Sequence, residues 1–225
     1  ERAGREVSVH SEIFSPWTQY MELFGYEQAL MYVLEDSGRV HAILDAYTRG
    51  TADLAVRQAK RGVDAVLISS AFAGGGFISP QQYEEFVLPY ERTVIEAVAQ
   101  CGIPVYTHTC GKIGDRLELM VDTGLQGIDT LDPPPLGTVD LQDAKRRVGS
   151  RIFFKGNIDP VHTLLDKPRE FVRQDALQRL AIGSRGSGYV LSSACSVSPR
   201  VPPENLTVLV EASREFGTPD SSISS

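Results

Sequence analysis

The sequence predicts an α/β fold of the TIM-type (β/α)8 barrel class. From residue 62 onward, short apolar runs rich in β-branched residues alternate with longer amphipathic runs, and Gly, Pro or Asp separates each pair. The chain has 225 residues, of which 42% are hydrophobic and 23% charged, which is typical of one globular domain with a sizeable core. The alternation favours a barrel over an open doubly wound sheet, the alternative that shares it.

Six segments are predicted to be strands because each is short, apolar and bounded by turn-forming residues. They are VSVHSEI from Val7, AVLISSAF from Ala65, IPVYTHT from Ile103, GIDTL from Gly127, RIFFKGN from Arg151 and GYVLSSA from Gly188. A closed barrel of this class needs eight strands. We therefore expect that two N-terminal βα units precede Glu1 in the complete fold and are lacking from this chain.

Helices are predicted between and after these strands. Ser79 and Pro80 open a long helix that reaches residue 100, with a kink at Pro89. Further helices are predicted over 114–124, 138–149 and 202–217, and one or two helices over 160–182. Residues 1–217 thus form a single partial barrel, the catalytic domain, and the polar segment 218–225 is predicted to be a disordered tail.

Charge and composition exclude several classes of function. A net charge of −7 and no basic run argue against a nucleic-acid or anionic-membrane surface. No apolar stretch approaches the roughly 18 to 20 residues of a membrane span, and the first residues lack a signal-peptide layout. Three cysteines cannot form a complete disulfide set, which indicates a reducing compartment. A cytoplasmic protein is the expectation.

Three metal-binding side chains follow two of the predicted strands. His108 and Cys110 stand two residues apart where IPVYTHTCGK runs out, and Cys195 ends the run GYVLSSACSV. Strand side chains repeat with a period of two, so His108 and Cys110 can point the same way. If both strands belong to one parallel sheet, their carboxyl ends share an edge and the three side chains can converge. One imidazole, two thiolates and an open fourth position suit a catalytic zinc site.

Other residues are weaker candidates. Glu12 or Asp159 is expected to fill the fourth position of the metal or to orient His108. Glu12 is also expected to line the pocket and contact the substrate, with a hydrogen-bonded pair with His10 at the strand end as the alternative. Asp129 and Asp132 follow a predicted strand and can be either pocket groups or turn formers. Cys101, near a helix end, is interpreted as a structural thiol.

One glycine-rich segment and one aromatic segment are interpreted as structural. The run Ala73 to Gly76 lacks the Lys-Ser or Lys-Thr of a phosphate-binding loop, which favours a flexible pocket loop. Phe14, Trp17 and Tyr20 follow the first strand, and we expect core packing, with an apolar wall of the active site as the alternative.

Four segments together resemble the uroporphyrinogen decarboxylase superfamily over nearly all of the chain. They are SPQQYEEFVLPYERTVIEAV, HTCGKIGDRLELMVDTGLQGID, FFKGNIDPVHTLL and YVLSSACSVSPRVPPENLTVLVEASREFG. Within that superfamily, His-x-Cys followed much later by Cys is similar to the zinc-dependent branch typified by methylcobamide:coenzyme M methyltransferases. The resemblance matches His108 and Cys110 to the paired zinc ligands and Cys195 to the distant one.

The resemblance implies a function as well as a fold. Members of that branch take a methyl group from methylcobalamin on a separate corrinoid protein and transfer it to a thiol held by zinc. The acceptor implied here is a thiol such as coenzyme M, or tetrahydrofolate. The GNIDP element, with Gly156, Asn157 and Asp159, matches a loop that lines the pocket and implies a contact with substrate. The alternatives are a decarboxylase acting on a porphyrinogen and a non-catalytic scaffold of the same fold.

Overall fold

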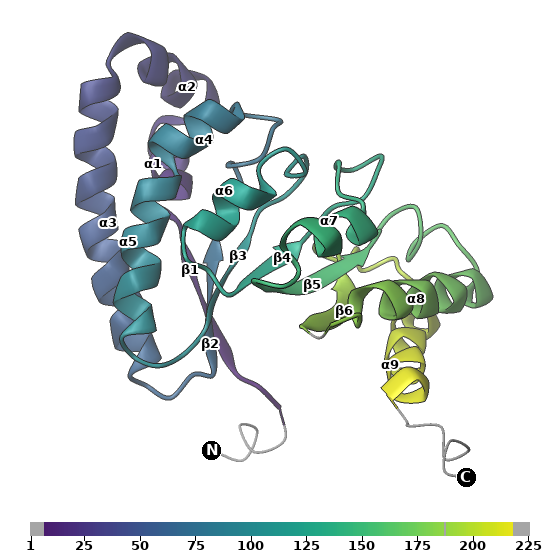
Figure 1. Ribbon diagram of the computed structural model, residues 1–225. Helices are drawn as coiled ribbons and strands as arrows, with labels where there is room; N and C mark the ends of the chain where they lie inside the picture. Colours follow the sequence, from purple (N-terminus) through teal and green to yellow (C-terminus); the bar gives the residue numbers. More distant parts are fainter. Residues whose placement is uncertain (1–6, 187, 218–225) are drawn as a thin grey trace.

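The computed structural model describes residues 7–186 and 188–217 and contains one parallel sheet packed against a layer of helices (Figure 1). The six strands lie in sequence order, each parallel to its neighbours. They are β1 (His10–Phe14), β2 (Ala65–Ser69), β3 (Val105–His108), β4 (Gly127–Thr130), β5 (Phe153–Ile158) and β6 (Tyr189–Ser193). All six predicted strands are confirmed. This sequential, all-parallel order is that of a partial TIM-type barrel.

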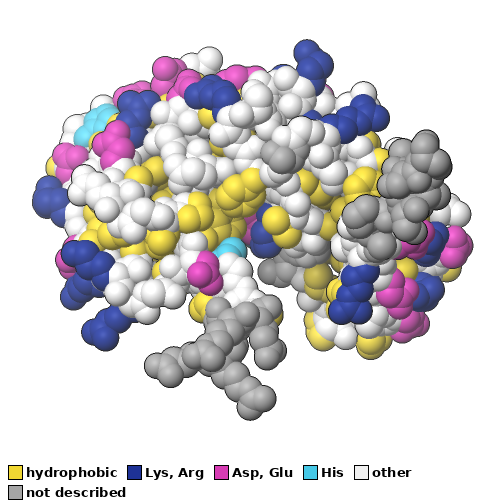
Figure 2. Space-filling view, turned by 60° about the horizontal axis from the view of Figure 1, so that its bottom comes forward, with side chains coloured by type: hydrophobic (Ala, Val, Ile, Leu, Met, Phe, Trp, Pro, Cys, Tyr) yellow, Lys and Arg dark blue, Asp and Glu magenta, His cyan; other side chains and the backbone are white. Residues whose placement is uncertain are grey.

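Within the described residues, β1 and β6 each have a strand neighbour on one side only. Hydrophobic side chains on these two strands remain exposed, since Phe14 and Val190 are each 50% accessible. Figure 2 shows that exposed hydrophobic side chains gather in a band across one face of the molecule. The predicted tail, 218–225, lies outside the described residues.

The helices that follow β2 occur in the predicted order. They are α4 (Pro80–Phe86), α5 (Leu88–Ala99), α6 (Leu117–Asp122), α7 (Leu141–Val148), α8 (Arg169–Gly183) and α9 (Pro203–Gly217). One detail differs from the prediction. The long helix is not merely kinked at Pro89 but is divided at Val87, because a proline in the first turn of α5 cannot donate a backbone hydrogen bond to the helix before it. The segment 160–182 contains one helix, within the one or two expected, and turns occupy its first part.

Three helices lie between β1 and β2, where helical sequence was expected without defined bounds. They are α1 (Pro16–Phe24), α2 (Tyr26–Glu35) and α3 (Ser37–Ala59). Ser15 caps α1 by accepting from the backbone N–H of Thr18, and Asp36 caps α3 in the same way. Figure 1 shows α3 alongside α5, and α8 alongside α9 at the other end of the sheet. No described helix combines the length and the apolar character that crossing a membrane requires.

The core lies between the sheet and this helix layer. Trp17 and Tyr20 are fully buried there, which confirms the core interpretation of these two residues, whereas Phe14 is half exposed. A buried cation, Arg116, ties the helix layer to the loop that follows β2. Its guanidinium donates to the carbonyls of Ala73 at 2.8 Å and Ile78 at 3.0 Å and pairs with Asp115 at 2.9 Å. Arg116 thus connects the two ends of the loop 73–78, and the expected flexibility of this loop stays a prediction.

Candidate metal centre

The three candidate metal ligands converge at the carboxyl edge of the sheet. His108 is the last residue of β3, Cys110 follows two residues later, and Cys195 lies two residues beyond β6. In a flat sheet, β3 and β6 would be roughly 14 Å apart. Nevertheless the Sγ atoms of Cys110 and Cys195 are 3.8 Å apart, and Cys110 Sγ lies 3.4 Å from His108 Nε2. The curvature of the partial barrel brings them together.

These distances match the edges of a tetrahedron around one ion. With Zn–S bonds of about 2.3 Å and Zn–N bonds of about 2.05 Å, tetrahedral angles place two sulfurs about 3.8 Å apart and sulfur and nitrogen about 3.6 Å apart. All three ligand atoms lie within 4.8 Å of one another, and no carboxylate of the described residues joins the group. The residues therefore fit a zinc ion with three protein ligands and one open position.

Asp129 orients the imidazole of His108. The two residues are cross-strand neighbours, and Asp129 Oδ2 lies 3.4 Å from His108 Nδ1, which leaves Nε2 directed at the thiols. Lys155, the partner of Asp129 on β5, donates to the same Oδ2 at 2.7 Å, and the backbone N–H of Thr130 donates to Oδ1 at 2.8 Å. Both oxygens of Asp129 are thus fixed, so the carboxylate holds the ring in one orientation.

This arrangement shifts the pKa values of the site. Burial alone would lower the pKa of His108, but the hydrogen bonds from His108 to Asp129 and Cys195 outweigh burial and raise it to about 9. Burial alone would raise the pKa of Asp129, but the hydrogen bonds from His108 and Lys155 hold it below its ordinary value. At neutral pH the metal-free site therefore contains an imidazolium and a carboxylate.

The two thiols share one proton. The hydrogen bond from Cys110, followed by that from His108, lowers the pKa of Cys195 to about 4. The same hydrogen bond to Cys195, together with burial, raises the pKa of Cys110 above its ordinary value. Cys195 is consequently a thiolate near neutral pH, the form that binds metals.

The backbone around Cys110 is tightly constrained. A Cβ on Gly74 would lie 2.5 Å from the carbonyl oxygen of Cys110, and Gly75 N–H donates to the Lys112 carbonyl at 2.7 Å. On the other side, the N–H of Gly111, which has a φ of 78°, donates to Asp132 Oδ2 at 2.6 Å. The Gly-rich segment therefore serves close backbone packing against the ligand loop, which only glycine permits at position 74.

The other predicted site residues lie apart from the trio. Glu12 is exposed on β1, two strands from His108. Asp159 accepts from the backbone N–H groups of Val161 and His162 at 2.8 Å and pairs with the His162 ring at 2.9 Å. The carboxylate of Asp159 therefore stabilises a turn. Asp129, and not Asp159, lies where it can orient the imidazole of His108.

Asn157 also has partners outside the trio. It is fully buried, donates to the Leu131 carbonyl at 2.8 Å and accepts from Arg179 of α8 at 2.5 Å. These bonds connect the end of β5 to the loop after β4 and to the helix layer. Contact of Asn157 or Asp159 with a substrate stays a prediction.

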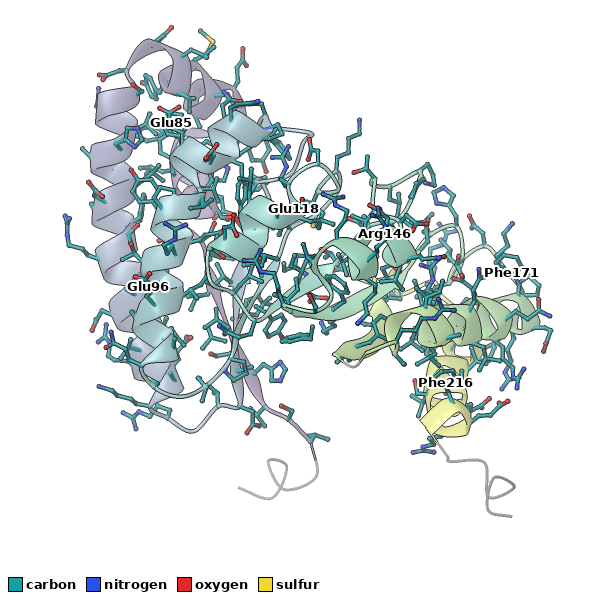
Figure 3. All side chains as sticks on the ribbon, viewed as in Figure 1. Glu85, Glu96, Glu118, Arg146, Phe171 and Phe216 are labelled. Carbon is teal, nitrogen blue, oxygen red and sulfur yellow. The ribbon has the colours of Figure 1, made fainter. Side chains whose placement is uncertain are left out.

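Figure 3 labels charged side chains that belong to the helix layer, among them Glu85 of α4, Glu96 of α5 and Glu118 of α6.

Sequence reasoning missed Lys155 and left the role of Asp129 open. Lys155 stands out in RIFFKGN as a cation inside a buried strand, which is a signal for a paired charge. The pairing itself depends on the register of three strands, which the sequence does not display.

Replacing Asp129 with asparagine should weaken zinc binding about 10- to 100-fold, because the partner that orients His108 and stabilises its charge distribution is lost. Competition with a chelator of known affinity measures this. Asp122→Asn, which removes an exposed carboxylate paired with Arg151, serves as the control and should leave the affinity unchanged. Equal affinities in all three proteins would rule out the orienting role of Asp129.

Replacing Gly74 with alanine should displace the Cys110 loop, because the new methyl group would collide with a backbone carbonyl that is itself held in place. We expect a loss of zinc affinity of about tenfold and of stability of about 1–3 kcal/mol. Gly76→Ala in the same segment is the matched control, since a Cβ there meets no atom within 4 Å. Thermal unfolding and zinc titration of the two variants test the difference.

The fold and the site define an α/β-barrel protein with a candidate metal centre at the carboxyl ends of its strands. Comparison with known proteins gives its family: the sequence model of uroporphyrinogen decarboxylase (URO-D) matches residues 1–216, and the chain belongs to this family of enzymes.

Curated relatives include the uroporphyrinogen decarboxylase of Legionella pneumophila (strain Corby), which is 30% identical over 212 residues covering 90% of this chain and 57% of that protein. The uroporphyrinogen decarboxylase of Psychromonas ingrahamii is 31% identical over 215 residues, covering 91% and 58%. The chain thus spans little more than half the length of these relatives.

Solved structures support the barrel fold. A methyltransferase from Methanosarcina mazei superposes with a TM-score of 0.84 at 23% identity, covering 96% of this chain and 61% of that one. Xanthomonas albilineans dihydropteroate synthase gives a TM-score of 0.51 at 14% identity, covering 94% and 69%. At these identities the similarity defines the fold alone.

Proposed function

We propose that His108, Cys110 and Cys195 hold one zinc ion and that the protein transfers a methyl group from a methylated corrinoid protein to a thiol such as coenzyme M, or to tetrahydrofolate. The observation that carries the proposal is the convergence of one imidazole and two thiols from β3 and the loop after β6 at tetrahedral spacing. Strand ends are where enzymes of this architecture place their active sites.

The donor set suits an activated thiol. When bound, zinc would keep an acceptor thiol deprotonated while its sulfur remains nucleophilic. Two thiolates and one neutral imidazole balance the 2+ charge of zinc. The site then has no net positive charge that would lower the nucleophilicity of an incoming thiolate. Asp129 retains the Nδ1 proton of His108 and thereby presents Nε2 as the donor atom.

The transfer itself needs alignment more than additional chemistry. The acceptor sulfur attacks the methyl carbon, the carbon–sulfur bond forms, and the carbon–cobalt bond breaks with both electrons staying on cobalt. The open fourth position at the edge of the sheet is available to the acceptor. A corrinoid protein would approach that same edge, and the reduced thiols of the centre suit a cytoplasmic location.

The second candidate is decarboxylation of a porphyrinogen, which the names of the curated relatives favour. A substrate with several carboxylates calls for cations in the pocket. The six described strands contain no arginine, and their single lysine, Lys155, is paired with Asp129. The charge of the sheet therefore favours methyl transfer over decarboxylation.

Two measurements on the purified protein test the proposal. The zinc content should be about one equivalent, and Cys195→Ser should reduce it, because a hydroxyl is a poor substitute for a thiolate ligand. Free methylcobalamin, offered with a panel of thiols and tetrahydrofolate, should be demethylated, which the change in cobalamin absorbance reports. Cys110→Ala should lose this activity, whereas Cys101→Ser, at the opposite end of β3, should retain it.

A zinc content below about a tenth of an equivalent that does not change in Cys195→Ser would exclude the metal site. Decarboxylation of uroporphyrinogen by the same preparation, without methyl transfer, would establish the second candidate instead.

A further inference from the structure

Two of the metal-binding side chains also form a pair of thiols close enough to react with each other. Cys110 Sγ and Cys195 Sγ are 3.8 Å apart, whereas a disulfide needs about 2.05 Å, so the two sulfurs must approach by less than 2 Å. Both residues are half-buried rather than enclosed, and both are free cysteines. A small oxidant can therefore reach them.

The two loops differ in their freedom to move. Cys110 is clamped, because Gly74 packs against its carbonyl and Asp132 holds the N–H of the next residue at 2.6 Å. Cys195 lies in a stretch without helix or strand, 194–202, which connects β6 to α9. The approach of the sulfurs therefore falls to Cys195, whose nearest backbone anchor is the bond from Ala194 N–H to the Ile158 carbonyl at 2.7 Å.

We propose that Cys110 and Cys195 form a reversible disulfide under peroxide and that this bond switches the metal centre off. One thiol reacts with hydrogen peroxide to give a sulfenic acid and water, and the second thiol displaces hydroxide from that sulfur to give the disulfide and a second water. Two thiols are thereby oxidised and one peroxide is reduced. The bond removes two of the three donor atoms at once, which leaves His108 alone and releases the ion.

The disulfide depends only on the position of the sulfurs, whereas its regulatory effect rests on the proposed zinc function. Bound zinc occupies both thiolates and should protect them, so oxidation and metal binding exclude each other. A reductant restores the dithiol and with it the binding site.

Oxidation of the metal-free, reduced 225-residue chain with about one equivalent of hydrogen peroxide tests the bond. Free thiols, counted after denaturation, should fall from three to one, and a dithiol reductant should restore three. Cys101→Ser is the matched variant, and its count should fall from two to zero. In that variant the tryptic peptides 93–112 and 186–200 each carry one cysteine, so their linked mass identifies the pair directly.

Three results would overturn the proposal: a thiol count that stays at three, a linked peptide that contains Cys101 instead, or a disulfide between two chains on a non-reducing gel. Cys110→Ser should stop at the sulfenic acid, which dimedone traps. The zinc arm separates the two proposals. The oxidation rate of zinc-loaded protein should be at most about one tenth of that of the metal-free protein. Oxidised protein should bind no zinc. Disulfide formation in a chain that never binds zinc would retain the bond and reject the proposed metal function.

Discussion

Zinc affinity should rise about 100-fold for each pH unit between roughly pH 5 and 8, because the ion must displace two protons from the site. The pKa of Cys195 is lowered to about 4, so this residue is already deprotonated in that range. The pKa of His108 is raised to about 9 and that of Cys110 also lies above its ordinary value, so both are protonated. Binding removes the proton from each, and affinity increases as pH rises.

Chelator competition across this range gives the slope, and proton release into a weak buffer gives the same number independently. Cys101→Ser should keep a slope of two. Asp129→Asn should reduce the slope toward one above pH 7, because the largest contribution that raises the pKa of His108 is lost. A slope of one or less in the wild-type protein throughout would contradict the protonation states that the site geometry implies.

The strands and most helices could be predicted because local rules determine them. Buried parallel strands appear as short apolar runs, and all six were found in this way. The bounds of α1 and α3 were not predicted, although Ser15 with Pro16 is the same N-terminal signal as Ser79 with Pro80.

The site could be predicted only in part, because its geometry depends on distant strands. Ligand chemistry and strand ends identified His108, Cys110 and Cys195, but their spacing comes from the curvature of the sheet. The roles of Asp129 and Lys155 follow from the register that places them beside His108 on neighbouring strands. Neither curvature nor register is encoded in a single local segment.

A buried carboxyl group in the helix layer should make the protein less stable at high pH. Glu91 of α5 is 1% exposed, its Oε2 accepts from Tyr83 Oη at 3.1 Å, and its Oε1 has no hydrogen-bond partner among the described residues. Burial raises the pKa of Glu91 from 4.5 to about 7, although the neighbouring hydroxyls of Ser70 and Tyr83 lower it in part. The folded state therefore binds this proton more tightly than the unfolded chain does.

This difference in proton affinity determines how stability changes with pH. Between about pH 4.5 and 7 the folded protein holds the proton and the unfolded chain does not, so the contribution of Glu91 to stability falls as pH rises through this window. The shift corresponds to about 3 kcal/mol, at about 1.4 kcal/mol for each pKa unit. Above pH 7 the cost stays constant, because both states are then ionised.

Replacing Glu91 with glutamine should remove this cost. The amide is neutral at every pH and keeps the shape of the protonated acid, so the variant should gain about 3 kcal/mol over the wild-type protein at pH 8 and little at pH 4.5. Urea unfolding of both proteins at several pH values gives the difference in their free energies of unfolding. The titration of all other groups cancels in this difference. Glu96→Gln, on the same helix but not among its buried residues, controls for the loss of charge alone. A stability difference between the two proteins that does not change with pH would contradict the raised pKa. It would show that Glu91 ionises as readily in the folded protein as in the unfolded chain.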